Sequence, residues 1–281
     1  MQSSNEMRIA VLIDADNVPR RSIKGVMAEI AVYGTPTIKR IYGDWTTPNM
    51  NGWKSALLEN AITPIQQYGY TTGKNSTDSA MIIDAMDLLY SGKVDGFCLV
   101  SSDSDFTRLA IRLREAGMTV YGMGEKKTPN PFIVACDRFI YIEIISPQQK
   151  PPQKKKTAKA PESAAPATAP AEENQQPEAA KEEAVSPEAA VRKAPQEIID
   201  LIAATIEDVN DDDGWAYLGE VGGLLQKKMP AFDARNYGYK KLTLLVGSLD
   251  CFEMDYRRNV QENNGKLIYI RNKAAARSAP Q

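Results

Sequence analysis

The sequence predicts an α/β protein whose larger domain has a mostly parallel sheet with helices on both faces. Over the first 146 residues, short apolar strand patterns alternate with helical patterns, as they do in βαβ units. Hydrophobic residues make up 43% of the chain and charged residues 25%, which is typical of a globular protein. At roughly 150 residues per domain, a chain of 281 residues corresponds to about two domains.

Hydrophobic periodicity and turn residues place the elements of this region in order along the chain. Strand patterns lie at residues 7–13, 37–42, 63–67, 96–101, 119–123 and 139–142. Helical patterns lie between them at residues 22–33, 53–60, 77–90 and 105–116. In folds of this kind, the active crevice lies at the carboxyl ends of the strands.

The composition changes sharply after Ser146. Residues 147–193 have no aromatic side chain and hold eight of the 17 prolines, so we predict a disordered linker. Residues 194–273 form a second domain, with helical patterns at 196–209, 221–228 and 242–248. Strand patterns at 252–255 and 267–270, around Asn263–Asn264–Gly265, predict a β-hairpin. We expect residues 274–281 to be a disordered tail.

Composition excludes several classes of chemistry. The chain has no histidine, which removes Ser-His-Asp triads, histidine-ligated zinc and acid–base catalysis by a histidine pair. The three cysteines show no paired spacing and fit a reducing cytoplasm. No apolar stretch approaches the ~20 residues of a membrane span. We therefore expect a cytoplasmic protein without a membrane partner. The net charge is −2, so any surface that binds nucleic acid must be a local cluster of basic residues.

Acidic residues follow the predicted strands at the edge where a crevice is expected. Asp14 comes directly after the first strand, and Asp103 and Asp105 follow the strand at 96–101. Asp78 begins the helix at 77–90 and falls in the middle of its apolar stripe, where an unpaired carboxylate is costly. Helix capping explains the residue type at Asp78 but does not explain why the other acids converge there.

Carboxylates that converge would repel one another, and a divalent cation removes that conflict. Oxygen ligands without histidine or cysteine favour Mg²⁺ or Mn²⁺. We predict that Asp14, Asp78, Asp103 and Asp105 hold the ion, although loop or cap chemistry also accounts for Asp105. Asn17 either orients a water or holds Asp14. Supporting groups at the same edge are Asp16, Asp84, Thr77, Ser101 and Ser102.

These residues resemble the NYN family of PIN-like ribonucleases. The resemblance rests on Asp14-Ala15-Asp16-Asn17, on Thr77-Asp78 with Asp84, and on Ser101-Ser102-Asp103-Ser104-Asp105-Phe106, and it covers residues 7–145. It implies a Rossmann-like PIN fold and RNA cleavage that depends on a divalent metal. By this resemblance Asp14, Asp78, Asp103 and Asp105 match the acidic metal-binding positions, Asn17 matches the polar partner, and Asp84 matches a supporting acid.

Residues 194–273 resemble an OST-HTH (LOTUS) domain. The segments that carry the resemblance are 213–222, 230–242, 252–254 and 267–270. They imply a small winged-helix fold that binds RNA or protein. Basic and aromatic residues cluster in this domain, where tyrosines would stack on bases and cations would meet phosphates, unless the tyrosines belong to the core. This cluster comprises Lys227, Lys228, Arg235, Tyr237, Tyr239, Lys240 and Lys241.

Basic residues also lie near the strand ends of the first domain, where they would hold a phosphate backbone beside the acids. They are Arg20, Arg21, Lys24, Arg108, Arg112, Lys126 and Lys127. Trp45 and Trp53 flank the exit of the second strand and either stack on a base or fill the core.

Three functions compete. The leading hypothesis is a metal-dependent ribonuclease whose C-terminal domain recruits RNA or a protein partner. The second is an RNA-binding regulatory adaptor that does not cleave. The third is a HAD-like phosphatase, because Asp14-Ala15-Asp16 mimics its paired acids. The interval from Asp78 to Ser101 offers only Lys93, badly placed for the lysine that such a phosphatase needs, so this hypothesis ranks last.

Overall fold

The computed structural model describes residues 6–68, 76–145, 194–258 and 266–273. The predicted linker at 147–193 and tail at 274–281 lie outside the described residues, as does the predicted turn at Asn263–Asn264–Gly265.

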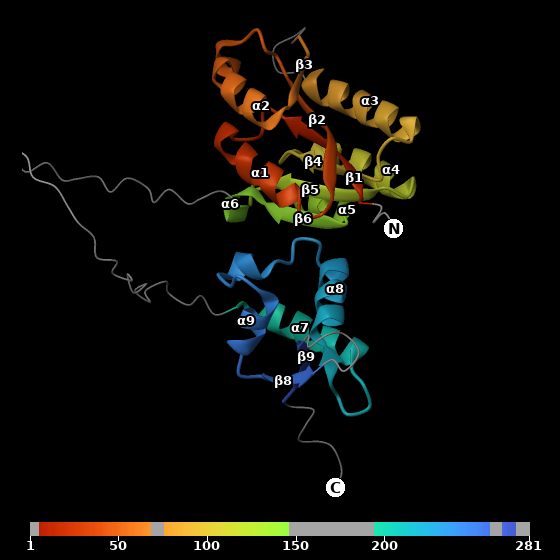
Figure 1. The fold of residues 1–281 in the computed structure, drawn as a ribbon, viewed down its shortest axis with the longest axis vertical. Coiled ribbons are helices and arrows are strands. Elements are labelled where there is room, and N and C mark those ends of the chain that lie inside the picture. The colour runs from red at the N-terminus through yellow and green to blue at the C-terminus, as the bar shows by residue number, and fades with distance from the viewer. Residues whose placement is uncertain (1–5, 69–75, 146–193, 259–265, 274–281) are drawn as a thin grey trace, which may run out of the picture. The chain divides into compact units, whose positions relative to one another are not determined.

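The N-terminal domain is built on a six-stranded sheet in which every described pairing is parallel. The strands lie in the order β3-β2-β1-β4-β5-β6, so the direction of winding reverses between β1 and β4 (Figure 1). Their bounds are β1 Arg8–Asp14, β2 Thr35–Gly43, β3 Thr63–Gln66, β4 Gly96–Val100, β5 Thr119–Gly124 and β6 Arg138–Tyr141. The predicted fold class is confirmed, and such a reversal is where ligands bind in open α/β sheets.

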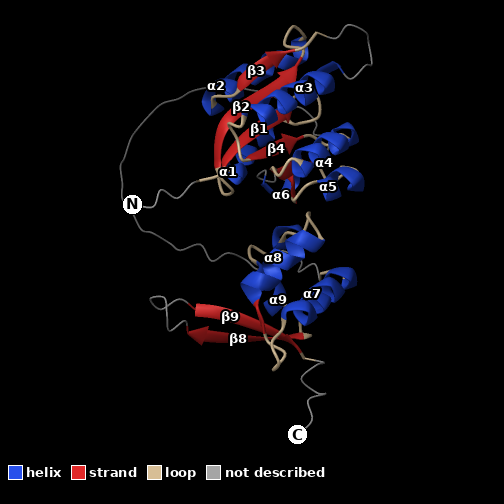
Figure 2. Cartoon of the chain, turned by 90° about the vertical axis from the view of Figure 1, so that its right-hand side faces the viewer, coloured by secondary structure: helices blue, strands red, loops and turns tan. Residues whose placement is uncertain are grey.

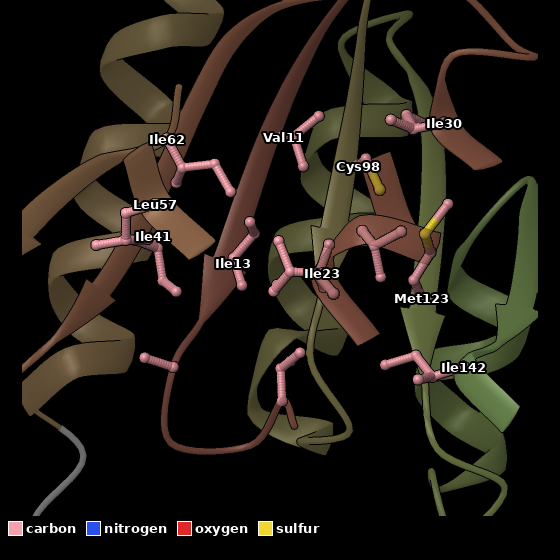
Figure 3. Packing of buried hydrophobic residues seen from close by; sticks show 14 of the residues in the cluster. Val11, Ile13, Ile23, Ile30, Ile41, Leu57, Ile62, Cys98, Met123 and Ile142 are labelled. Atoms are coloured by element: carbon pink, nitrogen blue, oxygen red, sulfur yellow. The ribbon is translucent and has the colours of Figure 1, made fainter. Parts of the chain in front are cut away.

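Alternate residues of β1 enter two separate cores, one on each face of the sheet. Ile9, Val11 and Ile13 pack with α1 (Ile23–Ile30), α2 (Lys54–Asn60) and α6 (Ile142–Ile145). Figure 3 shows Val11 and Ile13 in this core. Ala10 and Leu12 pack on the other face, which is covered by α3 (Ser76–Ser91), α4 (Thr107–Glu115) and α5 (Asn130–Ala135). This two-sided burial explains why β1 is a continuous apolar run and does not alternate with polar residues.

The sequence analysis missed two helices, α5 and α6. They have six and four residues, which is too short for a helical period to be recognised in the sequence. The helix expected at 53–60 begins instead as a 3-10 turn, Pro48–Trp53, before α2. Trp53 is 5% exposed and lies in the core, so it fills the core and is not available to stack on a base.

The C-terminal domain combines three helices with a three-stranded antiparallel sheet. The helices are α7 (Gln196–Val209), α8 (Leu218–Lys228) and α9 (Leu242–Gly247). The strands β7 (Ala216–Tyr217), β8 (Phe252–Arg258) and β9 (Lys266–Asn272) lie in the order β7-β9-β8. Figure 2 shows β8 beside β9. The predicted helices and paired strands are confirmed, whereas β7 was not predicted because two residues carry no alternation. Ile202, Ile206, Val221 and Ile270 are fully buried between the helices and the sheet.

Among the helices of the described residues, none is long and apolar enough to cross a membrane.

Gly122 shows how tightly the β5–β6 region is packed. A Cβ atom on Gly122 would lie 2.5 Å from the Phe139 ring and 2.7 Å from the Cys136 Sγ, and both side chains are buried. We expect Gly122→Ala to cost about 1–3 kcal/mol of stability through overpacking. As a control, Gly223→Ala in α8 meets no atom within 4 Å. Calorimetry checks this. We expect Gly122→Ala to lower the melting midpoint of the parent and Gly223→Ala to leave it unchanged. Equal midpoints for the two variants would contradict the packing argument.

Candidate active site

The site is built where the sheet reverses direction, at the adjacent carboxyl ends of β1 and β4. Asp14 is the last residue of β1, and Ser101 and Asp103 follow β4. Asp78 comes from the first turn of α3, which packs on β1 and β2, and is only 9% exposed. Residues that are far apart in the sequence therefore meet at one edge of the sheet.

Three carboxylates converge at this edge. Asp78, Asp103 and Asp105 each offer an oxygen atom, and these atoms all lie within 4.8 Å of one another. We call these residues the acidic trio. Its donors are all oxygen atoms, the ligands that Mg²⁺ and Mn²⁺ prefer.

Burial and neighbouring negative charge act together on Asp78. They raise the pKa of its carboxyl group to about 6, with burial the largest cause, followed by the charges of Asp14, Asp103, Asp105 and Asp16. A cation between these carboxylates would relieve the repulsion. The acidic trio therefore fits a hard divalent ion in both the chemistry and the spacing of its ligand atoms.

Asp14 lies beside the acidic trio in a different environment. Its carboxylate is 1% exposed and accepts hydrogen bonds from the Asp16 amide (3.0 Å), the Asn17 side-chain amide (2.7 Å) and the Ser101 hydroxyl (2.8 Å). Of the two roles considered for Asn17, the structure shows the hydrogen bond to Asp14. Three donors hold this carboxylate in one orientation beside the acidic trio.

Two consecutive serines connect β4 to the strands on either side. The Ser101 hydroxyl donates to Asp14 after β1 and accepts from the Asp103 amide at 3.1 Å. The Ser102 hydroxyl accepts from the Glu125 amide after β5 at 2.8 Å. These hydrogen bonds fix the backbone on which Asp103 stands.

Asp103 takes part in two arrangements at this edge. Its carboxylate caps the 3-10 turn Ser104–Phe106 by accepting from the Asp105 amide at 2.9 Å, and it also belongs to the acidic trio. Capping and metal ligation are compatible because a carboxylate has about four lone-pair sites.

Asp84 lies farther along α3 and acts on the position of that helix. Its carboxylate accepts hydrogen bonds from the Arg40 guanidinium and from the buried Tyr42 hydroxyl, both on β2. The Arg40 partner neutralises Asp84, which is not one of the acidic trio. These bonds hold α3 against β2 and thereby support Asp78, six residues earlier.

The sequence analysis missed Asp44, which follows β2 at the same edge of the sheet. Burial is the largest cause of the raised pKa of Asp16, and the charges of Asp14 and Asp44 add to it, while a hydrogen bond with Thr77 opposes them. The search for acids after strands could have found Asp44, because it stands in the pattern Tyr42-Gly43-Asp44 at the end of a strand.

The predicted basic residues of this domain follow β1, β4 and β5, the strands whose ends form the site. All seven are exposed, but several already have partners: Arg20 donates to the Gly52 carbonyl, Arg112 to the Tyr90 hydroxyl at 3.0 Å, and Lys127 pairs with Glu125 at 2.6 Å. Because Tyr90 is in the last turn of α3 and Asp78 is in the first, Arg112 lies toward the far end of that helix and away from the acidic trio.

The strand order is that of Rossmann-like folds, whose ligands bind at the reversal point, and here carboxylates gather at that point. Residues 8–143 match the NYN domain family of PIN-like nucleases, and residues 190–263 match the OST-HTH/LOTUS domain family. NYN domains form a nuclease family that typically depends on divalent metals, and OST-HTH/LOTUS domains suggest RNA binding. This architecture fits an RNA-acting nuclease or an RNA-binding protein.

Solved structures similar to this chain come from three bacteria. A protein of unknown function from Vibrio parahaemolyticus is 21% identical, with a TM-score of 0.44, over 50% of this chain and 96% of that one. An uncharacterized protein from Nitrosomonas europaea is 35% identical, with a TM-score of 0.27, over 33% of this chain and 91% of that one. A Chromobacterium violaceum protein is 35% identical, with a TM-score of 0.23, over 29% of this chain and 84% of that one. No curated protein matches the chain.

The raised pKa of Asp78 predicts a stability cost at neutral pH. The charged carboxylate is disfavoured in the folded state, so the cost is full above pH ~6 and fades as the pH falls from about 6 toward 3.8. We expect Asp78→Asn to stabilise the metal-free protein by about 1–2 kcal/mol at pH 7.5 and by almost nothing at pH 4. Chemical denaturation in EDTA measures both values.

Asp87→Asn is the matched control, because Asp87 lies on the exposed face of the same helix. We expect it to stay within about 0.5 kcal/mol of the parent at both pH values. A destabilised Asp78→Asn protein at pH 7.5 would show that Asp78 is not under charge repulsion.

Proposed function

We propose that this protein is a divalent-metal-dependent ribonuclease. The observation that carries the proposal is the acidic trio at the reversal point of an NYN-type sheet. Asp78, Asp103 and Asp105 would hold Mg²⁺ or Mn²⁺, with Asp14 beside them. When bound, such an ion supplies positive charge to a phosphate and lowers the pKa of a bound water.

The protein's own groups would prepare the site for a phosphodiester. Asn17 and Ser101 orient Asp14, and the serines after β4 fix Asp103. Exposed cations after β1, β4 and β5, including Arg21, Arg108 and Lys126, would bind the phosphates that flank the reacting one. Under this proposal the metal would neutralise the acidic trio, and these cations would neutralise the flanking phosphates.

The C-terminal domain would recruit the substrate. An RNA strand held by one domain has a raised local concentration at the other, because both belong to one chain. Candidate contacts are Lys227, Lys240 and Lys241, all exposed. We therefore propose RNA as the substrate class and as the ligand shared by both domains.

Cleavage of labelled single-stranded RNA with Mn²⁺ tests the activity. Because each 1.4 kcal/mol of lost transition-state stabilisation lowers the rate tenfold and a metal supplies several kcal/mol, we expect Asp103→Asn to lose about 100-fold or more. Asp14→Asn should also lose activity, since its oriented carboxylate lies beside the acidic trio. The exposed variant Asp87→Asn should cleave like the parent, and undiminished cleavage by both site variants would refute the site.

Metal binding can be tested without RNA. A ligand present at 100 times its dissociation constant stabilises a folded protein by about 2.7 kcal/mol. We expect Mn²⁺ to raise the melting temperature of the parent and of Asp87→Asn but not that of Asp103→Asn. A metal-induced shift without cleavage of any RNA would favour the non-cleaving RNA-binding adaptor. An equal shift in Asp103→Asn would remove Asp103 from the ligand set.

A further inference from the structure

The C-terminal domain presents an aromatic and cationic surface that lies outside the predicted RNA contacts. In a strand, successive side chains point to opposite faces. Ala216, Phe252 and Ile270 point to the core of this domain and are buried. Their neighbours point to the outer face of the β7-β9-β8 sheet, which we call the outer sheet face. It carries Trp215, Tyr217, Arg257, Tyr269 and Arg271.

Rings and guanidinium groups on the outer sheet face lie against one another. The Arg257 guanidinium lies 4.2 Å from the centre of the Tyr269 ring and 5.4 Å from that of Trp215. The Arg271 guanidinium lies 4.5 Å from the Trp215 ring, and the Tyr217 and Tyr269 rings are 5.9 Å apart. The result is a continuous set of flat groups across three strands.

Acidic residues on β8 hold the two arginines in place. Asp255 accepts from Arg257 at 2.9 Å, and Glu253 accepts from Arg271 at 2.6 Å. Arg257 donates through Nε, and Arg271 donates through one terminal nitrogen of its guanidinium group. Since a guanidinium carries five N–H donors in a planar fork, each arginine retains further donors at its edge.

Local structure fixes the two aromatic residues of the loop and β7. The Trp215 amide donates to the Asp211 carboxylate at 2.7 Å, in a loop that turns at Gly214 with φ +77°. The Tyr217 ring lies over Gly219, where a Cβ atom would be only 2.7 Å from the ring. Glycine at 219 therefore lets an exposed ring lie close to the start of α8.

The basic-aromatic cluster predicted from the sequence offers fewer free rings. Tyr237 packs against Phe232 with ring centres 6.2 Å apart, and Tyr239 packs on the core of this domain. Lys228 pairs with Asp208, and Arg235 pairs with Asp233 at 2.7 Å. The predicted cluster therefore offers exposed lysines that can bind phosphates. The rings that are placed for stacking lie on the outer sheet face.

We propose that the outer sheet face binds single-stranded RNA by stacking its bases on Tyr217 and the neighbouring Trp215, Tyr269 and arginine planes. This inference rests on the proposed function for its choice of RNA. Unpaired bases stack on aromatic rings and on guanidinium planes, and nearby N–H groups meet the phosphates. A face of rings interleaved with paired charges suits flat bases with polar edges better than it suits an apolar protein surface.

The test uses the full chain and a short fluorescein-labelled oligouridine in EDTA, with anisotropy as the readout. We expect Tyr217→Ala to weaken binding about 10-fold, because stacking on one ring is lost. Tyr217→Phe keeps the ring and should bind within about twofold of the parent. Tyr256→Ala is the matched control: Tyr256 is 56% exposed on the opposite face of the same sheet, whereas Tyr217 is 41% exposed.

An abasic strand of the same length separates stacking from phosphate contacts. We expect Tyr217→Ala to leave binding of the abasic strand unchanged, and to leave the salt dependence of oligouridine binding unchanged, since no phosphate contact is removed. Normal oligouridine binding by Tyr217→Ala, or an equal loss in Tyr256→Ala, would overturn the proposal and leave the face for a protein partner. Absence of oligouridine binding by the parent would overturn it too.

Failure of this inference and failure of the proposed function give different results. A parent protein that cleaves RNA while Tyr217→Ala binds normally would disprove stacking on the outer sheet face alone. A parent protein that cleaves no RNA with any divalent ion, while Tyr217→Ala loses binding, would disprove the ribonuclease alone.

Discussion

The hydrogen bonds accepted by the buried Asp14 carboxylate join the two strand ends between which the site is built. Ser101 connects this carboxylate, at the end of β1, to the backbone amide of Asp103 after β4. The sheet winds in opposite directions from this point, and the Ser101–Asp14 hydrogen bond joins the two loops across it. If Asp14 were free to rotate, the Ser101 hydroxyl would lose the partner that orients it toward the Asp103 amide. The geometry of the acidic trio therefore depends on a residue that is itself not part of it.

Charge repulsion at this edge has to be opposed by the rest of the domain. Asp78 is held among other carboxylates at 9% exposure, and its pKa is raised as a result. Such an arrangement persists only when the surrounding structure is stable enough to enforce it. The two apolar cores on either side of β1 and the bonds from Arg40 and Tyr42 to Asp84 supply that stability. A stretch of strand and helix that looks purely structural thus determines how closely the carboxylates can be brought together.

The sequence was sufficient to predict the alternating fold and the edge at which the acids meet, because both follow from local periodicity and one topological rule. It was insufficient where an outcome depends on contacts between distant segments. A helical projection places Asp84 at the edge of an apolar stripe, but its pairing with Arg40 requires the packing of α3 on β2. Likewise, Trp215 stands within the motif that suggested the second domain, yet its stacking with Arg257 and Arg271 depends on the register of β8 and β9. Asp44 is a different case, since the rule that found Asp14 applies to it as well.

Two opposite requirements of RNA explain why a chain of this kind benefits from two domains. A cluster of carboxylates repels a phosphate backbone until a cation is present, so under the proposed function the acidic trio would contribute little binding before a metal is in place. Stacking on rings needs no such charge balance, and the outer sheet face carries two arginines already balanced by Asp255 and Glu253. Binding through bases and reaction at phosphates then use different parts of the same strand. Because the contacts that hold the strand need not compete with the groups that act on it, affinity can be provided by one domain without shielding the acidic trio in the other.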